Sequence, residues 1–104
     1  MKRNIVKVYE GILIEEDKPL SISKLSERCM ISKVEIEELV YEGVIEPLKV
    51  QEESWSFASD TLWRVKKVQR LRRDLDLNIP GAALTIQLLD RIEELENMIK
   101  RSTE

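Results

Sequence analysis

The fold of this chain is decided by residues 21–47, SISKLSERCMISKVEIEELVYEGVIEP. Ser32 and Glu35 have the spacing of a capping box, in which a hydroxyl and a carboxylate each satisfy a backbone N–H that the first helical turn leaves unpaired. Gly43 can adopt the left-handed conformation that commonly ends a helix. The pattern therefore predicts a helix that begins after Ser32 and ends at Gly43.

A shorter helix is predicted just before it. Pro19 ends whatever precedes it, and either Ser21 or Ser23 can cap a helix that runs to about Cys29, with its apolar residues on one face. Two short helices separated by about three residues form a helix-turn-helix.

The segments that follow predict a wing and two longer helices. The apolar residues of LKV (48–50) and SWSF (54–57) surround a polar centre, which is typical of a hairpin. Ser59 can cap a third helix from about Asp60 to Leu75, with an apolar stripe that includes Leu75. After a short loop, Pro80 suits the first position of a final helix.

The amino-terminal run from Ile5 to Ile14 is rich in β-branched residues, so a strand is favoured, with a bend or bulge at Gly11. Whether the first sixteen residues form a strand against the wing or a flexible arm stays open. The resulting organisation is an amino-terminal strand or arm (1–19), a winged helix-turn-helix with a third helix (20–76), and a carboxy-terminal helix (77–104).

The final helix carries an apolar seam. Four of its members recur at spacings of four, three and four residues, the periodicity of a coiled coil. So short a seam needs a second helix, either in its own chain or in another copy. We expect a homodimer whose interface consists of Leu84, Leu88, Ile92, Leu95 and Ile99.

The composition excludes most familiar active sites. The 104 residues include no histidine and one cysteine, Cys29, so histidine acid–base catalysis, Cys/His zinc sites and intrachain disulfides lack their residues. No phosphate-binding glycine loop or nucleophile elbow is present. We expect no enzyme activity, cofactor, metal or small-molecule substrate. With no apolar stretch near the length of a membrane span and no leader pattern, we expect a cytoplasmic protein with no membrane contact.

Charge is unevenly distributed along the chain. Residues 31–60 hold eight acidic and two basic side chains, and residues 61–73 hold six basic and no acidic ones. The second helix directs Glu35, Glu38 and Glu42 outward, where a DNA-reading helix needs cations and amides. Three interpretations stay open for this face: a solvated surface, a DNA reader, or a docking surface for a basic protein.

The basic stretch WRVKKVQRLRR (63–73) has two interpretations. Arg64, Lys67 and Arg70 could contact nucleic-acid phosphates. Internal pairing with the acidic half, combined with coverage of apolar neighbours by the long side chains, is favoured.

The aromatic residues of this region, Trp55, Phe57 and Trp63, fall at apolar positions of their elements. They are therefore expected in the core and wing packing rather than in an open stacking platform. Cys29 is expected to be a small buried apolar residue.

Several pieces of the sequence resemble a known family when they are taken in order. Residues 21–47 resemble the helix-turn-helix of MerR-like proteins. The later segments EGVIEP, QEESWSF, VQRLRRDLDLNIPGAAL and LLDRIEEL resemble the chaperone-modulator family CbpM, over about residues 20–99. The residues that carry the resemblance are Gly43, Glu46, Pro47, Gln51, Glu52, Trp55, Phe57, Arg70, Leu71, Leu75, Leu77, Gly81, Ala83, Leu89, Asp90 and Ile92.

The resemblance implies a mainly α, MerR-like winged helix-turn-helix with a small β component and a coiled-coil-like dimerising helix. It also implies a non-enzymatic protein that binds the J-domain of a DnaJ-like (CbpA-type) co-chaperone and blocks stimulation of a DnaK-type chaperone. Since J-domains resemble one another in carrying a basic helix, an acidic surface could occupy that helix. We expect the contact at Glu35, Glu38, Tyr41, Glu42, Glu46, Gln51 and Glu52. The alternative is a MerR-like DNA-binding transcription regulator. For this protein we expect DNA binding to be weak or absent.

Overall fold

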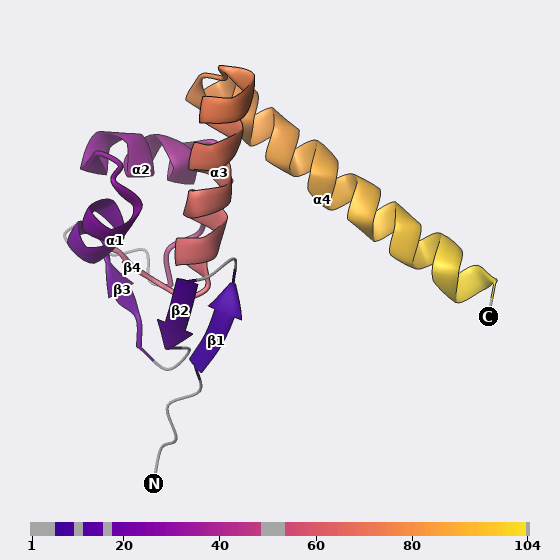
Figure 1. The fold of residues 1–104 in the computed structure, drawn as a ribbon, viewed down its shortest axis with the longest axis horizontal. Coiled ribbons are helices and arrows are strands. Elements are labelled where there is room, and N and C mark those ends of the chain that lie inside the picture. Colours follow the sequence, from indigo (N-terminus) through magenta and orange to yellow (C-terminus); the bar gives the residue numbers. More distant parts are fainter. Residues whose placement is uncertain (1–5, 10–11, 16–17, 49–53, 104) are drawn as a thin grey trace, which may run out of the picture.

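The computed structural model describes residues 6–9, 12–15, 18–48 and 54–103. Their order is two strands, a short strand, two short helices, another short strand and two longer helices (Figure 1). The elements are β1 (Val6–Tyr9), β2 (Ile12–Glu15), β3 (Leu20–Ser21), α1 (Ile22–Cys29), α2 (Lys33–Tyr41), β4 (Ser56–Phe57), α3 (Thr61–Leu75) and α4 (Ile79–Ser102). The mainly helical architecture confirms the predicted fold class.

The two helix starts of the helix-turn-helix are capped as the sequence predicts. Ser21 caps α1, and its Oγ accepts a hydrogen bond from the Lys24 N–H at 3.1 Å. The capping box of α2 is complete: the Glu35 N–H donates to Ser32 Oγ at 3.1 Å, and the Ser32 N–H donates to Glu35 Oε1 at 3.4 Å. Local hydrogen bonding thus fixes where both helices begin.

The end of α2 is also set by its sequence. Gly43 has φ +76°, a conformation that side chains rarely adopt. Its N–H donates to the Val40 carbonyl at 3.0 Å, and the Val44 N–H donates to the Leu39 carbonyl at 2.9 Å. This pair of hydrogen bonds is a Schellman motif. It turns the chain so that Val44 enters the core, where it is 3% exposed.

Helix α3 lies at the centre of the packing and contacts both α1 and α4. Its stripe is buried at Leu62, Val65 and Val68. Leu75, expected in the same stripe, is 58% exposed because it lies in the last turn, beyond the packed region. The predicted cap is also wrong: Ser59 is buried, and the residue at the N-cap is Asp60, whose side chain makes no capping hydrogen bond.

The core joins the helix-turn-helix to β3, β4 and the first turns of α4. Its most buried large side chains come from α1, α2, α3, α4 and β4. They are Leu25, Ile36, Leu39, Phe57, Val65, Val68 and Ile86. Cys29, 4% exposed, belongs to the same core, as expected. Phe57 is fully buried, and Trp55 and Trp63 pack against the core partly buried, which confirms their predicted role.

The strands differ from the sequence prediction. The amino-terminal run is two antiparallel strands, β1 and β2, with Tyr9 opposite Ile12, rather than one bent strand. Gly11, where a bend or bulge was expected, lies outside the described residues, and the two strands form an antiparallel pair. This hairpin does not pair with β4, whose Phe57 lies opposite Leu20 of β3.

The predicted wing is described in part. The Leu48 N–H donates to the Ser56 carbonyl at 2.7 Å, which brings the two predicted arms together at that point. Residues 49–53 lie outside the described part of the chain. The pairing of β4 with β3 was missed because it joins residues 35 or more positions apart, beyond the reach of local turn signals.

Helix α4 starts in the core and then leaves it. Asn78 caps it by accepting from the Gly81 N–H at 2.8 Å, with Pro80 in the first turn. Its first two turns bury Ile79 and Ile86 with two alanines. Beyond these turns the helix projects away from the rest of the molecule as an extended rod (Figure 1).

Candidate partner-binding surface

The exposed face at the end of α2 follows directly from the residues that α2 buries. Ile36 and Leu39 are fully buried. The helical period then places Glu38, Tyr41 and Glu42 in solvent, and Tyr41 is 80% exposed. An aromatic ring between two carboxylates therefore occupies the helix that a DNA-binding helix-turn-helix would place in the major groove.

Aromatic packing holds Tyr41 beside the wing. The Tyr41 ring meets Trp55 edge-on, with ring centroids 6.5 Å apart, and Trp55 in turn meets Phe57 edge-on at 6.3 Å. Phe57 anchors this row in the core. The row connects the acidic end of α2 to β4 and so links the exposed Tyr41 ring to the core.

The carboxylates of this surface do not help α2 to form. The carbonyl end of a helix carries a partial negative charge and favours cations. The last turn of α2 contains Glu38 and no basic residue, and Glu42 is its C-cap. Both side chains are exposed. Local stability therefore gives no reason for carboxylates at these two positions.

Glu46, another expected contact, is exposed in the segment that follows the Schellman turn. Gln51 and Glu52 lie outside the described residues. We define the acidic surface as Glu38, Tyr41, Glu42 and Glu46.

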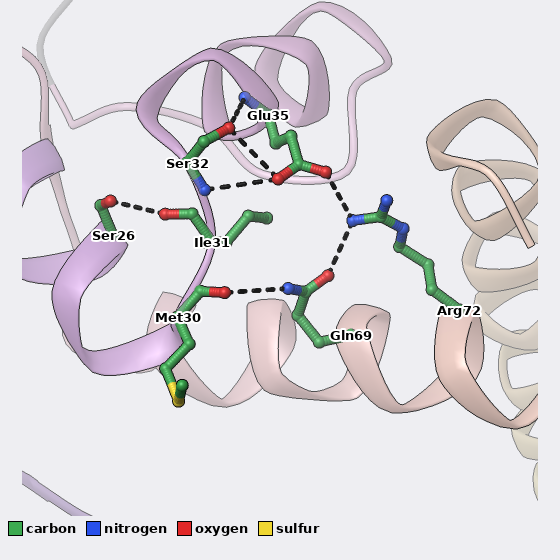
Figure 2. A network of polar contacts seen from close by, with 7 residues as sticks. All are labelled: Ser26, Met30, Ile31, Ser32, Glu35, Gln69 and Arg72. Carbon is green, nitrogen blue, oxygen red and sulfur yellow. Dashed lines mark hydrogen bonds and ion pairs between the residues drawn. The ribbon is translucent and has the colours of Figure 1, made fainter.

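Glu35 differs from the other carboxylates because it is engaged within the molecule (Figure 2). Its Oε2 lies 2.9 Å from Arg72 Nη1 on α3, and its Oε1 completes the capping box with Ser32. Burial alone would raise the pKa of Glu35, but the hydrogen bonds from Arg72 and Ser32 and the charge of Arg72 outweigh it and lower the pKa below 4.5. Glu35 therefore joins α2 to α3 rather than lying free for a partner.

The network around Glu35 extends to the turn between α1 and α2. Arg72 Nη1 also donates to Gln69 Oε1 at 2.9 Å, and Gln69 Nε2 donates to the Met30 carbonyl at 3.5 Å (Figure 2). Met30 has φ +52° and ends α1 in the left-handed conformation. Two side chains of α3 thus hold the position of the turn and of the α2 start.

Arg64 is a second structural contact of the basic helix. Its Nε donates to the carbonyl of buried Val44, and its Nη2 lies 2.7 Å from Asp90 Oδ2 on α4. Gln87 of α4 adds a hydrogen bond to the Glu42 carbonyl at 3.1 Å. The base of α4 is therefore fixed against the turn that ends α2.

These contacts bear on the two interpretations of the basic stretch. Arg72 pairs with the acidic half, as favoured, whereas Arg64 pairs with Asp90 in the carboxy-terminal half. Lys67 lies 5.1 Å from the Trp63 ring centroid, a cation–π contact. Sequence reasoning missed the Arg64–Asp90 pair because its residues are 26 positions apart. No local pattern marks such a pair.

Two further features concern metals and membranes. In the described residues, no group of three or more His, Cys, Asp or Glu side chains is arranged to hold a metal ion. Across those same ranges, none of the helices has both the length and the apolar character of a membrane span.

Known proteins resemble this chain over most of its length. Residues 20–102 match the family model described as MerR HTH family regulatory protein. A chaperone modulatory protein CbpM of Coxiella burnetii (strain Dugway 5J108-111) is 38% identical over 94 residues, which cover 90% of this chain and 89% of the relative. A chaperone modulatory protein CbpM of Escherichia coli O1:K1 is 38% identical over 82 residues, which cover 74% of this chain and 81% of the relative. With its capped helix-turn-helix and these relatives, the chain belongs to the CbpM family of MerR-type helix-turn-helix proteins.

Proposed function

We propose that this protein is a non-enzymatic cytoplasmic modulator of a chaperone system. It binds the J-domain of a DnaJ-like co-chaperone and prevents that domain from stimulating its DnaK-type chaperone. The names of the relatives support the chaperone-modulating role. The observation that carries the J-domain assignment is the acidic surface at the end of α2, where a gene regulator of the same architecture needs positive charge.

Electrostatics favours a basic protein partner over DNA at this surface. DNA would bring phosphates against exposed Glu38 and Glu42, and like charges facing one another across an interface cost several kcal/mol. The basic helix of a J-domain instead meets opposite charge, which steers association and fixes orientation. Tyr41 offers an aromatic anchor of the type that dominates binding energy in protein interfaces.

A double charge reversal tests this assignment. Glu38→Lys with Glu42→Lys should slow association with a J-domain by about tenfold at low salt, and by less at high salt, because steering is screened. The fold should survive, with stability equal to the wild type or up to about 1 kcal/mol higher, because cations suit a helix carboxyl end. Stopped-flow fluorescence measures the rates, and thermal unfolding measures the stability.

The matched control changes the net charge equally at other places. Glu27→Lys on α1 with Glu96→Lys on α4 replaces two exposed carboxylates outside the acidic surface. This control should keep most of the association rate. Equal slowing in both double variants, or unchanged rates in the α2 variant, would contradict the proposed contact.

The MerR match supports a second candidate, a DNA-binding transcription regulator. It requires binding to duplex DNA with an affinity that falls steeply as salt rises. A mobility-shift titration on random and genomic fragments distinguishes the two candidates. A tight salt-sensitive shift without J-domain binding would favour the regulator.

A homodimer is the second part of the proposal. The seam residues of α4 project into solvent, from 40% exposed at Leu95 to 63% at Ile99. Regular coiled-coil spacing on a projecting helix favours a second copy of the same helix as the partner. An apolar seam this short needs a second helix to pack against it, because isolated short helical segments are only marginally stable in water.

Sedimentation equilibrium tests the dimer. The wild type should have the mass of two chains at high micromolar concentration, and Leu88→Asp with Ile92→Asp should have the mass of one. Asn97→Asp, an exposed change outside the seam, should remain dimeric. A wild-type mass of one chain would contradict the dimer.

A further inference from the structure

A cleft lies on the side of α3 that faces the turn between α1 and α2. Its volume is about 830 Å³, within the range of small-molecule sites. Four basic side chains of α3 line the cleft, namely Lys66, Arg70, Arg72 and Arg73. Two acidic side chains also line it, Glu35 of α2 and Asp76 at the end of α3. The cleft is therefore cationic in a chain whose net charge is −3.

The placement of these cations is not explained by helix stability alone. Arg73 Nε lies 3.5 Å from Asp74 Oδ1 in an exposed ion pair. The negative carboxyl end of α3 favours Arg72 and Arg73, which lie in its last turn. Lys66 lies more than a turn earlier.

Arg72 is already oriented in the cleft wall. Its Nη1 is fixed by Glu35 at 2.9 Å and by Gln69 at 2.9 Å (Figure 2). Its Nε is buried and has no hydrogen-bond partner within the described part of the chain. A guanidinium that is held in place loses little freedom when a negative charge arrives.

The rest of the lining suits an organic body. Met30, which is 86% exposed, lines the cleft together with partly buried Leu77 and buried Cys29. The side chains of Met30 and Leu77 are apolar, so they can pack against an apolar part of a ligand. The site thus combines a cationic region with an apolar one.

We propose that this cleft binds a small organic phosphate. Its phosphate lies among Lys66, Arg72 and Arg73, and its apolar body lies against Met30 and Leu77. A phosphate monoester carries nearly two negative charges at neutral pH, and the lining contains more basic than acidic side chains. The proposal does not depend on J-domain binding, because none of the residues of the acidic surface lines the cleft.

Calorimetric titration tests the proposal with three probes. Phenyl phosphate should bind with a dissociation constant below about 1 mM. Inorganic phosphate should bind about tenfold more weakly because it lacks the apolar body. Phenol should give no measurable heat of binding. Equal affinity for phenyl phosphate and inorganic phosphate would contradict the proposed contact with an apolar ligand body. Absence of binding for both would contradict the proposed phosphate site.

Variants then locate the binding. Lys66→Gln with Arg73→Gln should weaken phenyl phosphate binding by tenfold or more. Lys67→Gln with Arg91→Gln removes the same charge from residues outside the lining and should leave the affinity within twofold of the wild type. Equal weakening in both pairs, or none in the first, would overturn the proposal. Binding of a DNA duplex that depends on Lys66 and Arg73, without binding of phenyl phosphate, would overturn it in favour of nucleic acid.

Discussion

The contacts that Arg64 makes with the turn after α2 and with α4 predict a large loss of stability from a single substitution. Arg64→Met keeps the aliphatic stem that covers apolar neighbours but removes the guanidinium. The buried Val44 carbonyl then loses its charged donor, and Asp90 loses its ion pair. The helix-turn-helix and the base of α4 would no longer be joined by this side chain.

The magnitude follows from the two contacts. A hydrogen bond from a charged donor to a buried acceptor contributes about 1.5–3 kcal/mol. The ion pair adds less than about 1 kcal/mol, because its side chains are 29% and 49% exposed. Arg64→Met should therefore destabilise the fold by about 2–3 kcal/mol, which for a domain of this size lowers Tm by about 10–20 °C.

Thermal and urea unfolding followed by circular dichroism measure this loss. Asp90→Asn is the matched comparison, because it removes the ion pair and leaves the Arg64 hydrogen bond to Val44. It should cost less than about 1 kcal/mol. If Arg64→Met were no more destabilising than Asp90→Asn, the contact with Val44 would not have the structural role assigned to it.

Two further predictions concern pH. The pKa of Glu35 is lowered below 4.5, so the stability that its charge contributes is present above pH 4.5 and is lost as pH falls through the folded-state pKa. Glu35→Gln keeps the capping box but loses the charge, so its free energy of unfolding at neutral pH should be about 0.5–1 kcal/mol below that of the wild type, and this difference should vanish in acid. A difference that does not change with pH would contradict the ion pair with Arg72. Burial, opposed by the charges of Lys66 and Arg28, raises the pKa of Cys29 from 9.0 to about 11. The stability that the neutral thiol contributes is present below pH 9.0 and is lost as pH rises toward 11. The free energy of unfolding of the wild type should therefore fall faster than that of Cys29→Ala across this range. Parallel curves for the two proteins would refute this effect of the Cys29 pKa.

Local signals account for the parts of the fold that the sequence predicts. The capping box at Ser32 and Glu35 and the left-handed Gly43 involve residues a few positions apart, so the bounds of α2 can be inferred from the chain alone. Met30 is an exception at the end of α1. It adopts φ +52° although it is not a glycine, because the turn into α2 requires that conformation.

Contacts between distant residues account for what sequence reasoning missed. Leu20 pairs with Phe57, and Arg64 pairs with Asp90, and neither pairing leaves a periodic pattern. For the candidate surface, the helical period correctly places Glu38 and Glu42 in solvent. It could not indicate that Glu35 is held by Arg72, because that depends on how α3 packs beside α2.

The measurement that tests the central claim most directly is the ATPase rate of a DnaK-type chaperone stimulated by a J-domain co-chaperone. Increasing amounts of this protein should lower the rate to its unstimulated level, and Glu38→Lys with Glu42→Lys should need a higher concentration for the same effect. A stimulated rate that stays constant up to tens of micromolar protein would contradict the account.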